Sequence, residues 1–578
     1  MVKLKIPKQP EINIGTAGHV DHGKCILPSE VIYSRHGAIK GHDLLSKAFK
    51  HGHFIPINEY EGYIEGFRVS VPTFNLLTKR FYITNGIVYV QRYRGPIYVI
   101  SDEVGGSLSA TPNHPILIRD GKRLSWKKIS QVNCNDEIVF TLFSINGSLS
   151  LDYCKVMDTK TITYDGIVID LFIPETHNFL AGPTGIISHN TTMIQALTGI
   201  WTSSHSEELR RGITIKIGYA DMPIYKLKRG SDVIYWPEPE YPGYSEPELM
   251  RVISFVDCPG HESLMANMLS GAAVMDGAIL VIAANEPVPR PQTKEHAMAL
   301  EILGIKDIVV VQNKIDLVSK EEAIKNYEQI KEFLATTKYY ADAPIIPISA
   351  IQKVNLEYLV EAIQKYIPTP KRDFSKPARM LVIRSFNINL PGTHYKKLRG
   401  GVIGGSIIQG KVKVGDELEI LPGYLYRKGD KVYHEPLYTE VLSLSTQKLR
   451  LEEAYSGGLI GIQTDLDPSL TRADGMVGNV AGKPGTLPEV RYDLSLDITL
   501  FTYVVGTDEQ IEVKPLTKGE PLRLNVGSAT SLGIVVGLGK DWADIKVTRP
   551  VVADDGWKVA IARRFNGKWR LIGVGEVK

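Results

Sequence analysis

A nucleotide-binding phosphate loop is present in this sequence as two halves that lie far apart. The first half, Gly18-His-Val-Asp-His-Gly-Lys24, is followed by Cys25, where such a loop requires Ser or Thr. The second half, Thr191-Thr192, completes the loop when Lys24 is joined directly to Thr191. Because a phosphate loop wraps one anion in consecutive backbone N–H groups, an insertion between its Lys and its Thr would separate two ligands of one nucleotide. We therefore predict that the segment Cys25 to Asn190 is removed; the alternative is a long loop insertion without chemistry.

The bulk composition is typical of a soluble, multidomain protein. The 578 residues exceed one domain, and 43% hydrophobic and 23% charged residues are ordinary for globular proteins. The net charge of +3 does not by itself indicate nucleic-acid binding. The sequence has no run of 18 apolar residues and no signal-peptide core, and its four scattered cysteines do not suggest a disulfide framework. We expect a cytoplasmic protein that does not enter a membrane.

The segment between the two halves has 166 residues and leaves 412 outside it. Its short apolar and aromatic runs between turns predict a compact all-β unit, with Asn85-Gly86 as a hairpin turn. The segment begins with Cys25, contains the motif Thr111-Pro-Asn-His114, and ends with His189-Asn190 before Thr191. An amide is a poor electrophile, so cleaving one calls for a good nucleophile such as a cysteine sulfur. The residue types at the ends of the segment therefore suit backbone cleavage.

These ends and motifs resemble those of an intein, a self-splicing element with the Hint fold, over the whole segment. The resemblance implies that the thiol of Cys25 attacks the carbonyl of Lys24 and converts the amide to a thioester. It implies that Thr111 and His114 polarise that carbonyl and protonate the departing nitrogen. The length leaves no obvious room for a homing endonuclease, which indicates a mini-intein.

The resemblance also implies the later steps of splicing. Thr191 would accept the acyl group on its hydroxyl, and Asn190 would cyclise through its side-chain amide and cut the chain. An ester-to-amide shift would then join Lys24 to Thr191. The supporting residues implied by the resemblance are His189, which would polarise the Asn190 amide, and Asp170 and His177, which would assist the acyl transfer.

Further nucleotide-binding motifs follow Thr191 in a fixed order. They are Arg210-Arg-Gly-Ile-Thr-Ile215, Asp257-Cys-Pro-Gly-His261, Asn313-Lys-Ile-Asp316 and Ser349-Ala350. Strands and helices alternate from residue 276 to 366, which predicts a parallel sheet covered by helices. The carboxylate of Asp316 suits the N1 and N2 donors of guanine, which adenine does not offer in that arrangement.

This order of motifs resembles that of the translational GTPases, and the resemblance implies GTP or GDP with Mg²⁺ as ligands. The residues implied to contact the nucleotide are Asp21, His22, Gly23, Lys24, Thr191, Thr192, Thr214, Gly260, Asn313, Lys314, Asp316, Ser349 and Ala350. The residues implied to hold Mg²⁺ are Thr191, Thr214 and Asp257. His261 is implied to position the attacking water during GTP hydrolysis.

Within the translational GTPases, residues 201–212 and 264–286 closely resemble the γ subunit of archaeal and eukaryotic initiation factor two. Elongation factor Tu typically has Asp-Gly in place of Asn285-Glu286. The γ subunits commonly carry a zinc knuckle between the two switch regions. Residues 221–250 contain no Cys and no His, so we predict that this chain binds no zinc there.

We expect an α/β P-loop GTPase domain and two β-barrels, with an all-β Hint-type intein inserted in the P-loop. Short apolar strands separated by glycine turns predict the barrels. The expected ranges are 1–24 and 191–370 for the two parts of the GTPase domain, 25–190 for the intein, 376–487 for the first barrel and 488–578 for the second.

The resemblance implies an initiation factor subunit that binds initiator methionyl-tRNA and delivers it to the small ribosomal subunit. It also implies a heterotrimer with α and β subunits, and slow intrinsic GTP hydrolysis. Two alternatives stay open. One is an elongation-factor-type GTPase, including the selenocysteine-specific kind, and the other is a precursor that neither splices nor hydrolyses GTP.

Overall fold

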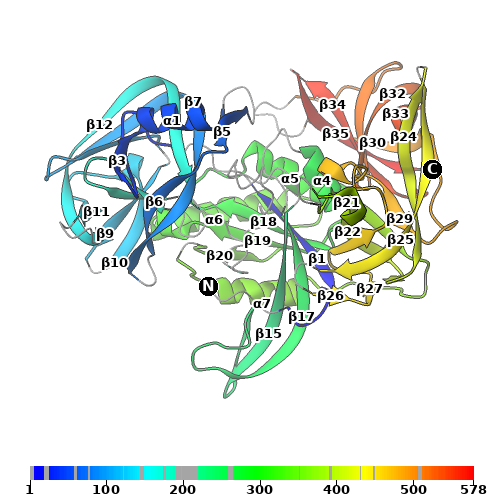
Figure 1. The fold of residues 1–578 in the computed structure, drawn as a ribbon, viewed down its shortest axis with the longest axis horizontal. Coiled ribbons are helices and arrows are strands. Elements are labelled where there is room, and N and C mark those ends of the chain that lie inside the picture. Colours follow the sequence, from blue (N-terminus) through cyan, green and yellow to red (C-terminus); the bar gives the residue numbers. More distant parts are fainter. Residues whose placement is uncertain are drawn as a thin grey trace.

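The fold is seen in a computed structural model (Figure 1). It describes residues 6–18, 25–56, 61–75, 79–112, 114–121, 123–143, 149–173, 178–189, 197, 218–257, 265–350, 352–389, 393–429, 431–446, 449–504, 511–565 and 567–578. Within these ranges the chain forms a helix-covered sheet, a β-rich unit beside it, and two further β domains on its other side (Figure 1).

A seven-stranded sheet forms the nucleotide-binding domain, in the order β16-β15-β17-β1-β18-β19-β20. The last five strands of this order are parallel, and β15 and β16 extend the sheet antiparallel. The strands read as nearly continuous apolar runs because both faces are buried, one in each of two apolar clusters. The alternation of strands and helices predicted for residues 276–366 is confirmed.

The strands of this domain are β1 (Ile12–Gly18), β15 (Gly218–Arg229), β16 (Asp232–Trp236), β17 (Ser245–Asp257), β18 (Gly277–Ala283), β19 (Ile308–Asn313) and β20 (Ile345–Pro347). Its helices are α4 (Met265–Ala272), α5 (Pro291–Ile302), α6 (Lys320–Ala335) and α7 (Leu356–Tyr366), with the short 3-10 helix η3 (Ile315–Leu317). Helix α6 begins at Ser319, which forms a capping box with Glu322.

Residues 25–189, called the inserted unit below, fold around their own thirteen-stranded sheet. Two long strands, β7 (Arg80–Asp102) and β12 (Leu149–Phe172), pair antiparallel along most of their length. The others are β2 (Val31–Ser34), β3 (Gly37–Lys40), β4 (His53–Pro56), β5 (Glu61–Glu65), β6 (Val69–Asn75), β8 (Ser107–Ala110), β9 (Pro115–Asp120), β10 (Arg123–Lys128), β11 (Glu137–Phe143), β13 (Asn178–Ala181) and β14 (Ile186–His189), with helices α1 (Gly41–His51) and η1 (Ile129–Gln131).

Two expectations for the inserted unit are wrong. Asn85-Gly86 does not form a hairpin turn but lies inside β7, paired with β6. The Ser70 hydroxyl donates to Asn85 Oδ1 at 2.6 Å, and pairing across the sheet overrides the local turn preference. The unit is also not entirely β, because α1 buries Leu44, Leu45 and Ala48 in the core of the unit.

The C-terminal part of the chain forms two β domains with separate apolar cores. The first has the strand order β24-β29-β21-β22-β28-β25-β26, and an additional β24–β25 pairing closes it into a barrel. The second is the closed barrel β30-β33-β32-β31-β34-β35. The two predicted β-barrels are therefore present.

The strands of the first barrel are β21 (Arg379–Phe386), β22 (Val402–Gln409), β24 (Glu417–Lys428), β25 (Lys431–Ser445), β26 (Arg450–Leu451), β28 (Ile460–Thr464) and β29 (Val480–Gly482). Beside them lie the pair β23 (Lys411–Lys413) and β27 (Glu453–Tyr455), and the short helices η4 (Tyr395–Lys397) and η5 (Arg472–Asp474). The second barrel has β30 (Val490–Leu500), β31 (Pro521–Val526), β32 (Ala529–Leu538), β33 (Trp542–Val552), β34 (Lys558–Phe565) and β35 (Lys568–Val577).

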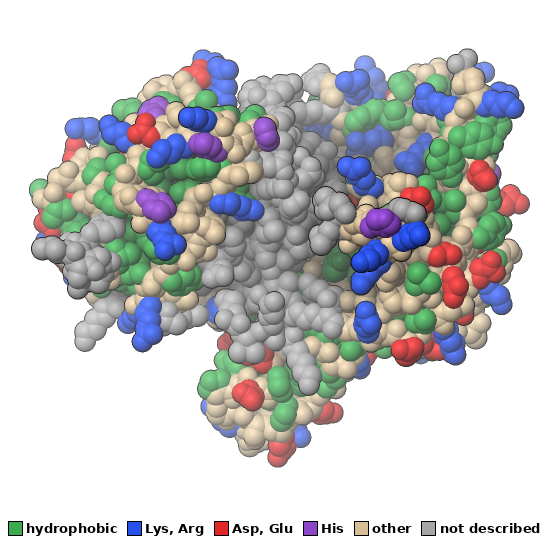
Figure 2. Space-filling view, in the orientation of Figure 1, with side chains coloured by type: hydrophobic (Ala, Val, Ile, Leu, Met, Phe, Trp, Pro, Cys, Tyr) green, Lys and Arg blue, Asp and Glu red, His purple; other side chains and the backbone are tan. Residues whose placement is uncertain are grey.

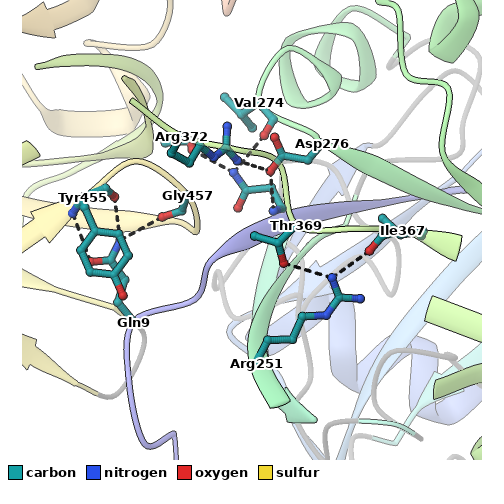
Figure 3. A network of polar contacts seen from close by, with 11 residues as sticks. Gln9, Arg251, Val274, Asp276, Ile367, Thr369, Arg372, Tyr455 and Gly457 are labelled. Atoms are coloured by element: carbon teal, nitrogen blue, oxygen red, sulfur yellow. Dashed lines mark hydrogen bonds and ion pairs between the residues drawn. The ribbon is translucent and has the colours of Figure 1, made fainter. Parts of the chain in front are cut away.

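The first barrel is fastened to the strand that leads into the phosphate loop (Figure 3). The side chain of Gln9 donates to the carbonyl oxygens of Tyr455, at 2.7 Å, and Gly457, at 2.9 Å. Asn13 of β1 donates to the hydroxyl of Ser406 at 2.8 Å. Gly457 has φ +110°, and a Cβ there would lie 2.4 Å from a backbone carbonyl oxygen of the N-terminal segment, so this approach requires glycine.

A mostly buried ion pair joins the turn before β18 to the segment that leads from the sheet domain into the first barrel. Arg372 Nη2 lies 2.6 Å from Asp276 Oδ2, which also accepts the N–H of Asn13 at 2.9 Å (Figure 3). Burial raises the pKa of the Asp276 carboxyl above its usual range, and the Arg372 charge opposes that rise. The Arg372 cation therefore stabilises the charged form of the Asp276 carboxylate at a place where water solvates it poorly.

Replacing Arg372 by Met is expected to lower the free energy of unfolding by about 2 kcal/mol at pH 7, because Asp276 is left buried without its cation. A carboxyl with a raised folded-state pKa stabilises the fold below its unfolded pKa and loses that contribution as the pH rises. The loss caused by Arg372→Met should therefore shrink on acidification, and Asp276→Asn should restore part of it. Urea unfolding at two pH values measures this, and an equal loss at both would contradict it.

The described surface carries charges of both signs. On the face shown in Figure 2, Lys and Arg side chains lie on the inserted unit and on the barrels, mixed with Asp and Glu. Within the described ranges, every helix is too short or too polar to cross a bilayer.

Candidate functional site

The carboxyl ends of the parallel strands meet at one edge of the sheet, where open α/β folds bind ligands. β1 ends at Gly18, where the first half of the phosphate loop begins, and β17 ends at Asp257. Asp257 is 8% exposed, and its Oδ1 accepts the hydroxyl of Thr16 at 2.7 Å. Thr16 also lies opposite Asp257 in the β1–β17 register. The sequence-predicted metal ligand Asp257 is therefore held beside the start of the phosphate loop.

The loops predicted to recognise the base are tied together by one side chain. Asn313 Oδ1 accepts the N–H of Lys314 at 2.8 Å and the N–H of Ala350 at 3.2 Å. Lys314 adopts the left-handed conformation with φ 67°, which turns the chain from β19 into η3. Ser349 is 1% exposed, and its hydroxyl accepts the N–H of Gln352 at 3.1 Å. The side-chain oxygen of Asn313 therefore holds the two loops in register.

Asp316 lies in η3, directly after these contacts. Both of its carboxylate oxygens are closed off from solvent, and no hydrogen-bond donor reaches them within the described part of the chain. A buried acceptor without a donor is costly. The N1 and N2 donors of a guanine base are groups that would satisfy it.

Several predicted nucleotide-site residues lie outside the described ranges. They are Asp21, His22, Gly23, Lys24, Thr191, Thr192, Thr214, Gly260 and His261. Of the predicted splicing residues, His177, Asn190 and Thr191 also lie outside them, as does the side chain of His189.

At the start of the inserted unit, Thr111 holds the backbone of Cys25 on both sides. The N–H of Cys25, which is the nitrogen of the Lys24–Cys25 amide, donates to Thr111 Oγ1 at 2.9 Å. The Thr111 hydroxyl donates to the Cys25 carbonyl oxygen at 3.0 Å, and the Thr111 N–H donates to the same oxygen at 2.9 Å. Cys25 as a whole residue is 2% exposed. The hydroxyl predicted to act on this amide is therefore in contact with its nitrogen.

His114 and Asp170 lie close to this contact in the fold. His114 is fully buried, and its backbone N–H donates to the backbone carbonyl oxygen of Thr111 at 2.9 Å. Asp170 is 7% exposed and follows Ile169, whose backbone bonds to Ile26 in both directions, at 2.8 and 2.9 Å. The hydrogen bond to Thr111 therefore places His114, and the pairing of Ile169 with Ile26 places Asp170, next to the start of the segment.

The end of the inserted unit returns to the same place. In β14, Ser188 pairs with Ile116 of β9, two residues beyond His114. His189 lies opposite Asn178 in the β13–β14 pair. The ring of Phe179 in β13 lies at 6.4 Å from the ring of His114, edge to face. The short stretch from Ala110 to Ile116 is thus contacted by both ends of the segment.

Two residues near the ends of the segment were missed by sequence reasoning. Gln91 of β7 lies with Oε1 at 3.6 Å from the Sγ of Cys25, a weak S–H···O contact. Asn178 is 1% exposed, and its side chain accepts the N–H of Phe74 at 2.9 Å and donates to the carbonyl oxygen of Phe74 at 2.8 Å, which fastens β13 to β6. Gln91 stands in no motif, and Asn178 directly follows the motif residue His177 without a predicted role of its own, because the role of each depends on strand register.

Residues 221–250 form a hairpin from β15 through β16 to the start of β17. Its tip is packed by rings: Trp236 lies 5.1 Å from Tyr241, Tyr241 lies 5.6 Å from Tyr244, and the Arg229 guanidinium lies 4.8 Å over Tyr244. In the described residues, no three His, Cys, Asp or Glu side chains are grouped to hold a metal. The absence of zinc at this hairpin stays a prediction.

Two family models match the chain. The elongation factor Tu GTP-binding domain matches residues 180–369, and the C-terminal domain of initiation factor eIF2 gamma matches residues 492–577. The translation initiation factor 2 subunit gamma of Pyrococcus furiosus is 54% identical over 398 residues, which are 69% of this chain and 96% of that protein. The subunit gamma of Methanocaldococcus jannaschii is 53% identical over 399 residues, again 69% of this chain and 96% of the relative.

Among solved structures, a bacterial selenocysteine-specific elongation factor is similar in fold. The TM-score is 0.51 at 23% sequence identity, with 67% of this chain matched. The match spans 55% of that longer elongation factor.

Proposed function

Because the chain belongs to the family of translation initiation factor 2 gamma subunits, we propose that its mature form delivers initiator methionyl-tRNA to the small ribosomal subunit. The chain is a GTPase of translation initiation. The observation that carries the proposal is 54% identity across 96% of a named initiation factor subunit. Partners proposed on the same ground are the α and β subunits of the factor, in a cytoplasmic heterotrimer.

We further propose that the mature form arises by autocatalytic splicing of Cys25–Asn190. The supporting observation is geometric: Thr111 contacts the nitrogen of the Lys24–Cys25 amide, and both ends of the inserted unit reach the stretch from Ala110 to Ile116. The matched relatives also leave about 180 residues of this chain uncovered, close to the 166 of the proposed intein. In this proposal the inserted unit has the Hint fold.

The proposed reaction begins with the sulfur of Cys25 attacking the carbonyl carbon of Lys24. The C–S bond forms, the C–N bond breaks, and the thiol proton passes to the nitrogen, which leaves as the free amine of Cys25. Thr111 holds this nitrogen, and the buried His114 is bonded to Thr111 through its backbone N–H, so we propose that both assist the proton transfer. Gln91 contacts the sulfur and orients it.

In the next step, the Thr191 hydroxyl oxygen bonds to the thioester carbon, the C–S bond breaks, and the hydroxyl proton passes to the Cys25 sulfur, which leaves an ester. Asn190 cyclises and releases the amino group of Thr191, and that amino group takes the acyl carbon from its own hydroxyl. Asp170, His177 and His189 are proposed to assist these steps. The product joins Lys24 to Thr191 and so completes the phosphate loop for GTP. The residues that would hold Mg²⁺ beside it are Thr191, Thr214 and Asp257.

The test is the intact mass of the purified product of the full gene, followed by tRNA binding. A 412-residue species and a 166-residue species are expected. The ligated species with GTP should bind initiator methionyl-tRNA in preference to elongator tRNA. Equal binding of both tRNAs would favour the elongation-factor alternative. A 578-residue chain alone, after reduction and warming, would favour the non-splicing precursor.

Replacing Thr111 by Val removes the hydroxyl from the scissile amide with little change of shape. We expect splicing to slow about 100-fold or more, the usual cost of losing one transition-state hydrogen-bond partner. Thr111→Ser keeps the hydroxyl and should retain most of the rate. The time course of the 412-residue product gives both rates, and a Val variant as fast as the parent would contradict the role given to Thr111.

A further inference from the structure

We propose that the inserted unit docks in cis on the guanine-recognition loop of its own host and keeps the guanine base out until it is excised. This inference rests on the proposed function to the extent that Asp316 recognises guanine. The proposed obstruction is separate from the interruption of the phosphate loop, because it acts at the guanine base and not at the phosphates.

The contact is made by Leu317 of η3. Leu317 packs against an apolar cluster that belongs entirely to the inserted unit and comes from β6, β9, β10, β11, β13 and β14. The buried members of this cluster are Phe74, Leu117, Trp126, Val139, Leu180 and Ile187. Within the described ranges, Leu317 belongs to this cluster and to neither core cluster of the nucleotide-binding sheet. A host side chain therefore completes a core of the inserted unit.

Strand β10 is the part of the unit that lies against η3. It carries Trp126, which is 1% exposed, and Leu124, which packs at the rim of the same cluster as Leu317. The strand has β9 as its pairing partner and stands off the main path of the sheet. The edge of the inserted unit is thus placed on the loop that begins at Asn313.

This docking coincides with a closed carboxylate. Asp316, the neighbour of Leu317, has both oxygens shut off from solvent and has no donor within the described chain. A guanine base must reach these oxygens with its N1 and N2 donors, and it needs open space beside η3 to do so. In the proposal β10 takes up this space, so that docking of β10 and guanine binding exclude each other. By linkage, guanine nucleotide must weaken the docking by the same factor by which docking weakens nucleotide binding.

The experiment uses the full chain with Cys25→Ala and Asn190→Ala, so that the precursor persists. Leu124→Asp is added to break the contact from the side of the inserted unit, and Leu317→Asp to break it from the host side. Leu151→Asp is the matched control, because Leu151 lies at the rim of the same cluster but on β12. Affinity for a fluorescent GDP analogue and hydrogen exchange in η3 are measured for all four chains.

We expect Leu124→Asp and Leu317→Asp each to raise the affinity for the GDP analogue at least tenfold and to speed exchange in η3. Leu151→Asp should do neither. Equal affinities for the parent and both contact variants, including no detectable binding by any of them, would overturn the proposal. An equal gain with Leu151→Asp would also overturn it, since general loosening of the unit would then be the cause.

GDP binding by the ligated protein tests guanine recognition by Asp316 separately from the docking proposal. If the ligated protein binds GDP and Asp316→Asn weakens that binding, guanine recognition by Asp316 stands whatever the precursor variants show. If the ligated protein binds GDP equally well with Asp316→Asn, guanine recognition by Asp316 fails and the docking proposal falls with it.

Discussion

Replacing both Cys25 and Asn190 by Ala is expected to leave a single 578-residue chain under conditions in which the parent yields species of 412 and 166 residues. In the proposed reaction Cys25 supplies the sulfur that attacks the Lys24 carbonyl, and Asn190 supplies the side-chain amide that cuts the other junction. Without either group an ordinary peptide bond remains at each end, and such bonds do not break unaided on this timescale. We therefore expect complete loss of splicing, measured by intact mass.

The single variants separate the two junctions. Cys25→Ala should leave Asn190 able to cyclise, so that slow cleavage gives fragments 1–190 and 191–578. Asn190→Ala should allow the thioester to form, so that a small thiol releases fragments 1–24 and 25–578. Cys134→Ala, a cysteine exposed on the inserted unit, serves as the control and should splice like the parent. Ligated product from the double variant would show that other groups carry the reaction.

The second large effect is expected at Asp316 in the ligated protein. Asp316→Asn should lower the affinity for GDP at least about 100-fold, because a carboxylate that accepts two base N–H groups becomes an amide that presents a donor to one of them. Xanthosine diphosphate has a carbonyl in place of the guanine amino group, so it should gain affinity for the same variant. Competition binding with the two nucleotides measures the exchange of preference.

The matched control for this variant is Asp307→Asn. Asp307 is exposed and directly precedes β19, so it is at the opposite end of the strand from Asn313 and Asp316. The Asp307→Asn variant should bind GDP with the same affinity as the ligated parent. If Asp316→Asn and Asp307→Asn bind GDP equally, then Asp316 does not contact the base.

Local pattern was sufficient for much of the fold. The alternation of strands and helices between 276 and 366 and the two C-terminal barrels follow from apolar periodicity and glycine turns, which are properties of short windows. The two expectations that proved wrong were overturned by tertiary contacts. Asn85-Gly86 is a strong local turn signal, yet β6 holds it extended, and α1 is stabilised by burial of Leu44, Leu45 and Ala48 rather than by strong helix caps.

The site divides in the same way. Asp257, Asn313 and Asp316 could be placed at one edge of the sheet because each stands at or just after the end of a strand, at a motif position. The sequence did not show that the Asn313 oxygen joins two loops, since Ala350 lies 37 positions further along the chain. Nor did it show Gln91 beside Cys25, because that depends on the register of β7 within the sheet.

By itself, the sequence determined where the inserted segment begins and ends and which residues stand at its two junctions. Cys25 and His189-Asn190-Thr191 bound a segment whose removal restores one phosphate loop, and the order of residues alone carries that information. Tertiary structure decided what surrounds these groups. Thr111 reaches the Cys25 amide across 86 positions, and Leu317 completes an apolar cluster of the inserted unit. Contacts of this kind depend on strand register and on the packing of separate sheets, which no local stretch of residues encodes.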